Sequence, residues 1–446
     1  MFVRVAAVFA LLQVLALGAV AAGDLIPDRE IIEELNSAVD SGAITATATP
    51  KQRTGGISDH SGECVLLSIG LGAWEGDGWF TQIATSPNLH SCPPMVDRLE
   101  AHRDGARLGG IRKIRYWNGL SVITRPALAT IGVNGLRTLS MLLLVGSLAM
   151  VAKTVGAAVG GRSAMALLGP VLAAADLLGL VEVFHHPLML SFGFLGIAAL
   201  ARRATQDHDW TDLLVAGFVV GSIYSFVDLM NFVPGLWVMS ASVVAACVPV
   251  QRDLATRARR MVAVGVAWPA GYVSMWAGKW VWAAVATSPS AVFDEITAQI
   301  EFRINGESRL TTGGFGKGLS ANVQFWLDQT LVPAVLVLSG IVIVTAIIRA
   351  ARSEVRSLST AGLIASPLLV LLAWLLVFNN HNEIHYWFEY RSLPMALGVV
   401  LMALHAPAAV EAHKLGSLPE ACEPAQHPRS GSEGTEGSTG GDREPY

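Results

Sequence analysis

Apolar stretches close to the length of a membrane-spanning helix constrain the fold of this chain more than any other feature. A helix needs about 20 apolar residues to cross the hydrocarbon core of a bilayer. The run at 358–378 has this length, and the run at 393–406 approaches it. Of the 446 residues, 52% are hydrophobic and only 15% are charged, whereas roughly 25% of a soluble domain is charged. The sequence therefore predicts an all-α, polytopic protein of the lipid bilayer.

The apolar runs predict a transmembrane helix bundle of about ten spans. We interpret the first run, 2–22, as a retained first transmembrane helix. A cleaved signal sequence is the alternative, because Ala19-Val20-Ala21 suits cleavage. The predicted spans lie at 2–22, 136–152, 164–183, 188–201, 213–227, 232–248, 262–287, 331–348, 358–378 and 393–406.

The remaining sequence divides into a large loop region, the bundle and a tail. Residues 23–135 are mostly hydrophilic and predict an external loop region with interfacial helices. Residues 136–406 form the predicted bundle, which includes an external loop at 288–329. Residues 407–446 predict a disordered cytoplasmic tail, because Gly, Ser, Pro and Glu are frequent there and apolar residues are few.

Lys and Arg residues in alternate connections predict the orientation of the chain. By the positive-inside rule, these connections face the cytoplasm. Their cations are Arg4, Lys153, Arg162, Arg202, Arg203, Arg252, Arg257, Arg259, Arg260, Arg349, Arg352, Arg356 and Lys414. The external segments are then 23–125, 184–187, 228–235, 288–329 and 379–391. We therefore expect any chemistry on the external face of the cytoplasmic membrane.

Charge, motifs and cysteines exclude several classes of protein. The formal net charge is −4, and no basic face is evident, so nucleic acid is not an expected partner. The sequence has no P-loop, no dinucleotide-binding glycine motif and no nucleophile elbow, which disfavours ATP-driven transport by this chain alone. Cys64 and Cys92 share the first loop region. They form a disulfide if that region faces an oxidising compartment, and otherwise stay free thiols.

Two acids in the first loop region are candidate catalytic residues. Asp59 and Glu63 are four residues apart, which puts both carboxylates on one face of a helix. The helix continues with apolar residues, so its acidic first turn is expected at the rim of a buried structure. The alternative is two solvated acids that the helix dipole favours at a helix start.

A polar turn between the last two apolar runs carries further candidates. His381 and His385 are also four residues apart and predict a site that orients a phosphate or a divalent metal. Arg391 is suited to bidentate contact with a phosphate, and Glu389 is its alternative partner. The other interpretation is that 379–385 forms a hydrogen-bonded cap at the membrane surface.

Lys279 and Asp228 are candidate ligands near the external ends of two predicted spans. A charged group within a span usually faces a cavity or a partner. Lys279 is therefore a candidate for neutralising a lipid-linked phosphate, with snorkelling to the interface as the alternative. Asp228 is expected to line the same cavity, whereas Asp176 and Glu182 are expected to hydrogen-bond between helices.

Two resemblances add to these predictions. One set of residues looks like a group of poorly characterised bacterial multi-pass membrane proteins: Tyr272, Met275, Trp276, Lys279, Trp280, Trp387, Phe388, Tyr390, Arg391 and the turn at Asp228. The layout of residues 1–406 resembles the GT-C class of integral-membrane glycosyltransferases. That resemblance implies a polyprenyl-phosphate-linked sugar donor and an acidic base in the first external loop. Asp59 and Glu63 are the acids nearest to that role.

Together these patterns predict a GT-C-like glycosyltransferase that modifies an envelope glycan or protein. Asp59 or Glu63 would accept the proton of the acceptor hydroxyl, and Lys279, Arg391 and Arg125 would hold the donor phosphate. A transporter or flippase with Lys279, Asp176 and Glu182 on its path is the first alternative. A non-catalytic envelope assembly protein is the second.

Overall fold

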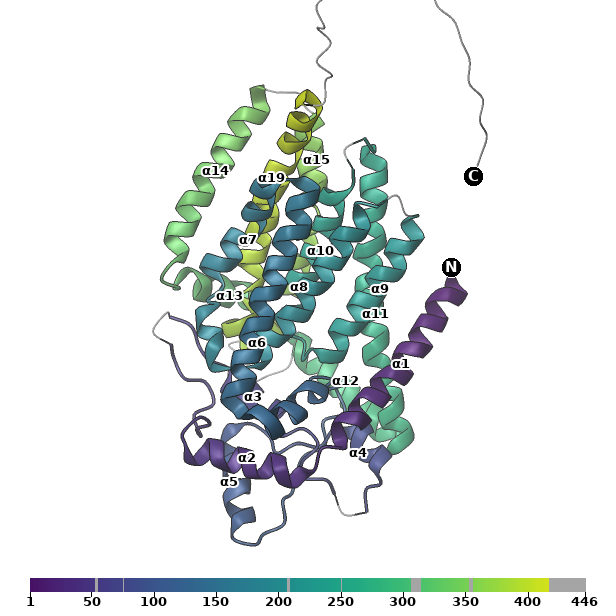
Figure 1. The fold of residues 1–446 in the computed structure, drawn as a ribbon, viewed down its shortest axis with the longest axis vertical. Coiled ribbons are helices and arrows are strands. Elements are labelled where there is room, and N and C mark those ends of the chain that lie inside the picture. Colours follow the sequence, from purple (N-terminus) through teal and green to yellow (C-terminus); the bar gives the residue numbers. More distant parts are fainter. Residues whose placement is uncertain are drawn as a thin grey trace, which may run out of the picture.

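Helices account for all regular secondary structure in the part of the chain that the structure describes. This computed structural model describes residues 1–52, 55–74, 76–206, 209–249, 251–305, 314–352 and 356–416 (Figure 1). No strand occurs in these ranges, where two isolated β-bridges join extended residues. The predicted all-α fold class is therefore confirmed.

Helices follow one another along most of the described chain. The first half contains α1 (Phe2–Asp24), α2 (Asp28–Asp40), α3 (His60–Leu67), α4 (Trp79–Thr85), α5 (Cys92–Arg103), α6 (Ser121–Val159), α7 (Gly161–Ala174), η1 (Leu178–Glu182), α8 (His185–Ala204) and α9 (Trp210–Val227). The second half contains α10 (Val233–Cys247), α11 (Leu254–Ala286), α12 (Pro289–Asn305), α13 (Lys317–Leu327), α14 (Val332–Arg352), α15 (Arg356–Ala365), α16 (Leu368–Val377), α17 (Asn379–Ile384), α18 (Tyr386–Glu389) and α19 (Ser392–Gly416).

The described helices include several that are suited to a membrane. Five are long and apolar enough to cross one: α1, α6, α8, α9 and the stretch Leu358–Val377. The count rises to six if α13 and the first part of α14, which meet at a bend of 98°, form one broken span. Helices α7 and α10 are apolar but shorter. The chain is thus a membrane protein with a helical bundle, and the predicted count of about ten spans is not confirmed.

The first loop region folds into a small helical layer against one end of the bundle. Helices α2, α3, α4 and α5 gather at the lower end in Figure 1, together with α12. Ile31, Leu35 and Met95 are fully buried in the core of this layer, which continues into Phe184 at the start of α8. A disulfide joins Cys64 to Cys92, so the paired alternative holds and α3 is linked to α5.

Helix α6 differs from the sequence prediction because it begins earlier and contains a kink. It runs from residue 121, within the predicted loop region, and Gly132 adopts a left-handed backbone conformation with φ 69°. Glycine has no Cβ and adopts this conformation without steric cost. Glu34 of α2 accepts a hydrogen bond from the Val133 N–H at 3.0 Å, which caps the second part of the helix. The predicted span 136–152 lies within this second part.

The predicted boundaries near the carboxyl end also shift. The expected loop 288–329 contains two helices, α12 and α13. Helix α19 continues past residue 406 to Gly416, so the first residues of the predicted tail are helical. The rest of that tail, 417–446, lies outside the described residues.

Candidate functional site

A buried carboxylate and two adjacent histidines form the most compact group of potential ligands in the described ranges. Asp59 Oδ2 lies 3.3 Å from His185 Nε2 and 3.5 Å from His186 Nε2. All three residues are buried, and one potential ligand atom from each lies within 4.8 Å of the others. The group joins the first loop region to the start of α8, and the contact between Asp59 and His185 spans 126 residues of sequence.

Local sequence explains the position of each member. Asp59 is the N-cap of α3, and its Oδ1 accepts a hydrogen bond from the Gly62 N–H at 2.9 Å, as expected for Asp at this position. His185 and His186 are the first two residues of α8, with Pro187 next, and proline is well tolerated in a first helical turn. The two imidazole rings are 4.1 Å apart between centroids.

The electrostatics of Asp59 favour its charged form. Burial acts to raise the pKa of this carboxyl, but hydrogen bonds and charges from His185 and His186 outweigh burial and hold the pKa well below its usual range. Asp59 is therefore a carboxylate at neutral pH. A buried carboxylate beside two imidazoles is suited to binding a cation or accepting a proton.

Glu63, the other acid predicted for catalysis, is held in an ion pair. Its carboxylate accepts hydrogen bonds from Arg137 Nε at 2.9 Å and from Arg137 Nη2 at 2.5 Å. It also accepts one from the Phe184 N–H at 3.1 Å. Glu63 is 1% exposed and its contacts connect α3, α6 and the start of α8. The geometry favours a bracing role for Glu63 and leaves Asp59 as the candidate base of the pair.

Three cations on two separate segments gather around Tyr116 and form what we call the cationic group: Lys113, Arg115 and Arg303. Of these, Lys113 interacts electrostatically with Asp59. Arg303 Nη2 donates to Tyr116 Oη at 2.8 Å, and the Lys113 ammonium and Arg115 guanidinium lie 6.0 and 5.9 Å from the centre of the same ring. Within the described ranges, Lys113 and Arg303 have no carboxylate partner within ion-pair distance, whereas Arg115 approaches Glu295 at 3.8 Å. Two incompletely neutralised cations favour an anionic ligand.

The charges of Arg115, Arg303 and Asp59 all act on Lys113. Burial, followed by repulsion from Arg115 and Arg303, lowers the pKa of Lys113 to about 7 against the attraction of Asp59. His385 is influenced by the same charges, since burial and then the charge of Arg303 lower its pKa to about 3. Asp59, the cationic group and His385 thus share one electrostatic environment.

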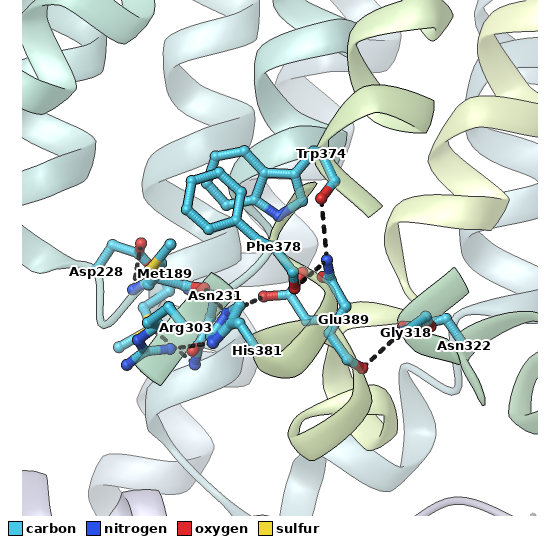
Figure 2. A network of polar contacts seen from close by, with 12 residues as sticks. Met189, Asp228, Asn231, Arg303, Gly318, Asn322, Trp374, Phe378, His381 and Glu389 are labelled. Atoms are coloured by element: carbon cyan, nitrogen blue, oxygen red, sulfur yellow. Dashed lines mark hydrogen bonds and ion pairs between the residues drawn. The ribbon is translucent and has the colours of Figure 1, made fainter. Parts of the chain in front are cut away.

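His381 belongs to a buried polar network next to this environment (Figure 2). Its Nε2 lies 3.2 Å from Glu389 Oε1 and 3.3 Å from the Met230 carbonyl oxygen, and its Nδ1 contacts Arg303. Burial and the charge of Asp228 hold the pKa of Glu389 well above its usual range. His381 and His385 remain close, with rings 4.8 Å apart between centroids. The network anchors the turn after α16 against α12 and the turn before α10.

Asp228 is buried at the turn between α9 and α10. It accepts hydrogen bonds from the Met230 and Asn231 N–H groups at 2.7 and 2.9 Å and from Tyr272 Oη at 2.8 Å. Burial raises the pKa of this carboxyl to about 7, against the effect of these hydrogen bonds. Asp228 therefore shapes the turn that carries Met230 and Asn231.

Three cations predicted to hold the donor phosphate are occupied by backbone carbonyl groups. Lys279 Nζ donates to the Ile83 carbonyl oxygen at 3.0 Å and to Ser86 Oγ at 2.9 Å. Arg391 Nε donates to the Ala175 carbonyl oxygen at 2.9 Å. Arg125 donates to three carbonyl oxygens and to Asp28. These side chains tie segments together, and the cationic group is better placed to contact an anion.

The sequence indicated some of these residues without their role. His185 and His186 have no sequence signal beyond their predicted external position, and Lys113 and Arg115 lie in the region for which the sequence predicts interfacial helices. Arg303 was not singled out. Its contact with Tyr116 spans 187 residues of sequence, so local spacing carries no information on it. The pair of adjacent histidines in a short external segment is the one local feature of the sequence that could have indicated this site.

Comparison of the chain with protein-family models, with curated proteins and with solved structures finds no match.

Proposed function

We propose that this chain is a GT-C-like membrane glycosyltransferase that uses a polyprenyl-phosphate-linked sugar donor on the external face of the cytoplasmic membrane. The acceptor is a glycan or protein of the cell envelope. The observation that carries the proposal is the grouping of a buried carboxylate, Asp59, with Lys113 and Arg303 beside a membrane bundle. A transferase with a lipid-phosphate donor needs both kinds of group, a base for the acceptor and cations for the leaving phosphate.

The proposed reaction assigns a role to each half of the site. The acceptor hydroxyl oxygen attacks the anomeric carbon of the sugar, and Asp59 accepts the hydroxyl proton. The bond from that carbon to the phosphate oxygen breaks, and the lipid phosphate leaves with the bonding electrons. Lys113, Arg115 and Arg303 stabilise the negative charge that this departure leaves on the phosphate. His385 interacts electrostatically with Asp59 and with the same three cations.

The disulfide between Cys64 and Cys92 supports an external position of the first loop region. Disulfides persist in oxidising compartments and are rare in the cytosol. The alternating distribution of cations in the sequence supports the same orientation.

Envelope glycan analysis tests the proposal. A strain that lacks the chain is complemented with the wild-type sequence, with Asp59→Asn or with Asp97→Asn, which changes an exposed acid of α5 and serves as the matched control. Removing a general base slows transfer by about 10²- to 10⁴-fold. We expect Asp59→Asn to show the glycan change of the deletion strain and Asp97→Asn to show the wild-type glycans, at equal protein levels. Unchanged glycans in all strains would contradict the proposal.

One observation favours a second function, proton-coupled transport. Asp228 and Glu389 are buried, and burial raises the pKa of Asp228 to about 7. A buried carboxyl with a pKa near neutral pH, such as that of Asp228, is suited to carrying protons. Proton flux into liposomes that contain the purified protein distinguishes the two functions. A transporter moves protons across the membrane in response to its substrate, and Asp228→Asn should abolish that flux.

A further inference from the structure

The group formed by Asp59, His185 and His186 has the composition of a transition-metal site. Two imidazole nitrogens and one carboxylate oxygen are ligands that Zn²⁺ accepts, and three protein ligands with one open position are typical of catalytic zinc. Mg²⁺ and Ca²⁺ prefer oxygen ligands and are poorly suited to two histidines. All three side chains are buried, so they are held in place before any ion binds.

The two distances from the Asp59 carboxylate to the histidines match a metal site better than a pair of hydrogen bonds. Metal bonds of about 2.0–2.1 Å in a tetrahedral arrangement separate the ligand atoms by roughly 3.3 Å. Asp59 Oδ2 lies 3.3 Å from His185 Nε2 and 3.5 Å from His186 Nε2. A charge-assisted hydrogen bond from an imidazole to a carboxylate is shorter, about 2.7–2.9 Å.

Unused hydrogen-bonding capacity points to the same conclusion. His186 Nε2 is buried, and its contact with Asp59 Oδ2, at 3.5 Å, is too long for a well-formed hydrogen bond. Asp59 Oδ1 is engaged by the Gly62 N–H, whereas Oδ2 has only the long contacts to His185 and His186. A buried polar atom without a partner costs about 1–3 kcal/mol in general, and a bound cation between these atoms removes that cost.

We infer that Asp59, His185 and His186 bind one divalent transition-metal ion, with Zn²⁺ as the best fit. The inference deepens the proposed function and rests on it for its role, because Asp59 belongs to the same site. With an ion bound, Asp59 would serve as a ligand and not as the base itself. The acceptor oxygen would occupy the open position and lose its proton to water, a loss that a metal ion makes easier.

Metal binding by the purified full-length protein tests the inference directly. The protein is stripped with a chelator, incubated with Zn²⁺ or Mg²⁺, desalted and analysed for metal by mass spectrometry. We expect one Zn²⁺ per chain and no stoichiometric Mg²⁺. His185→Ala and His186→Ala should each weaken Zn²⁺ binding by about 100-fold or more, since loss of a residue that merely supports a ligand already costs 10–100-fold. His60→Ala, which changes the neighbouring histidine outside the group, should retain Zn²⁺.

A second measurement keeps the test valid if a variant folds poorly. Co²⁺ replaces Zn²⁺ in such sites, and its visible absorption reports tetrahedral coordination. This measurement needs only the wild-type protein. No Zn²⁺ beyond trace levels in folded wild-type protein, or equal binding by His186→Ala, would overturn the inference. Sugar transfer by a metal-free chain would overturn the role of the ion in transfer and leave the proposed function intact. One Zn²⁺ bound per chain without sugar transfer would support the metal site and contradict the proposed function.

Discussion

Replacing Arg137 with methionine tests whether Glu63 braces the fold. Arg137→Met removes both guanidinium hydrogen bonds from a carboxylate that is 1% exposed, and only the Phe184 N–H remains as a donor to it. Leaving one charge of a buried ion pair without its partner costs about 3–5 kcal/mol. The equilibrium constant for unfolding should therefore rise by over a hundredfold to several thousandfold, since about 1.4 kcal/mol corresponds to a factor of ten.

The surface pair of Arg29 and Glu33 provides the matched control. These side chains are also in contact, at 2.6 Å, but they are 86% and 61% exposed. Exposed pairs at this helical spacing contribute about 0.3–0.5 kcal/mol, so Arg29→Met should change the free energy of unfolding little. Unfolding in mixed micelles by SDS titration, followed by tryptophan fluorescence, measures both variants.

A double-mutant cycle separates the ion pair from other effects of the substitution. The variant Glu63→Leu with Arg137→Met removes both charges and should recover much of the stability lost by Arg137→Met alone, because the uncompensated charge is gone. An Arg137→Met variant as stable as the Arg29→Met control, or a double variant less stable than the sum of its single variants, would refute the bracing role of Glu63.

Three further predictions follow from the same geometry. Replacing both Cys64 and Cys92 with alanine should lower the free energy of unfolding by about 2–4 kcal/mol, and an unchanged midpoint of the SDS titration in non-reducing buffer would argue against the disulfide. Affinity for a polyprenyl phosphate should fall above pH 7 by up to about tenfold per pH unit, because Lys113, with a pKa of about 7, loses its charge. Lys113→Arg should remove that decline, and a variant with the same pH profile as the wild type would exclude Lys113 from the site. Arg125→Met should lower the free energy of unfolding by about 3 kcal/mol, at about 1 kcal/mol for each of three carbonyl partners. Lipid-phosphate binding by the folded variant should not weaken. A tenfold weaker affinity would show that Arg125 belongs to the donor site.

The sequence predicted the class of fold because that class depends on composition and on the length of apolar runs. Buried and lipid-facing helices both require apolar residues, so the all-α bundle and the hydrophilic first loop region could be predicted locally. The number of spans could not be settled in this way. Helices α7 and α10 are apolar yet shorter than a bilayer requires, and short apolar runs do not distinguish a span from a helix buried within the bundle.

The candidate site was predicted in part, and the limits have a physical cause. Asp59 could be found because an acid at the start of an apolar helix is a local pattern. Whether Glu63 was free or paired depended on Arg137, which lies 74 residues away. The same holds for Lys279, whose partners Ile83 and Ser86 belong to a distant segment. Charged residues near a membrane serve as ligands or as braces, and only their tertiary partners distinguish the two roles.

Binding of a polyprenyl phosphate to the purified chain in nanodiscs tests the central claim most directly. The claim is that the cationic group holds the phosphate of a lipid-linked donor. Arg303→Gln removes a cation with no carboxylate partner in the described ranges, and Arg103→Gln, on the exposed surface of α5, is the matched control. We predict that the wild-type chain and Arg103→Gln bind equally and that Arg303→Gln binds at least about tenfold more weakly, as loss of a charge-assisted hydrogen bond of about 1.5–3 kcal/mol requires. Equal binding by all three proteins, or no binding by any of them, would contradict the claim.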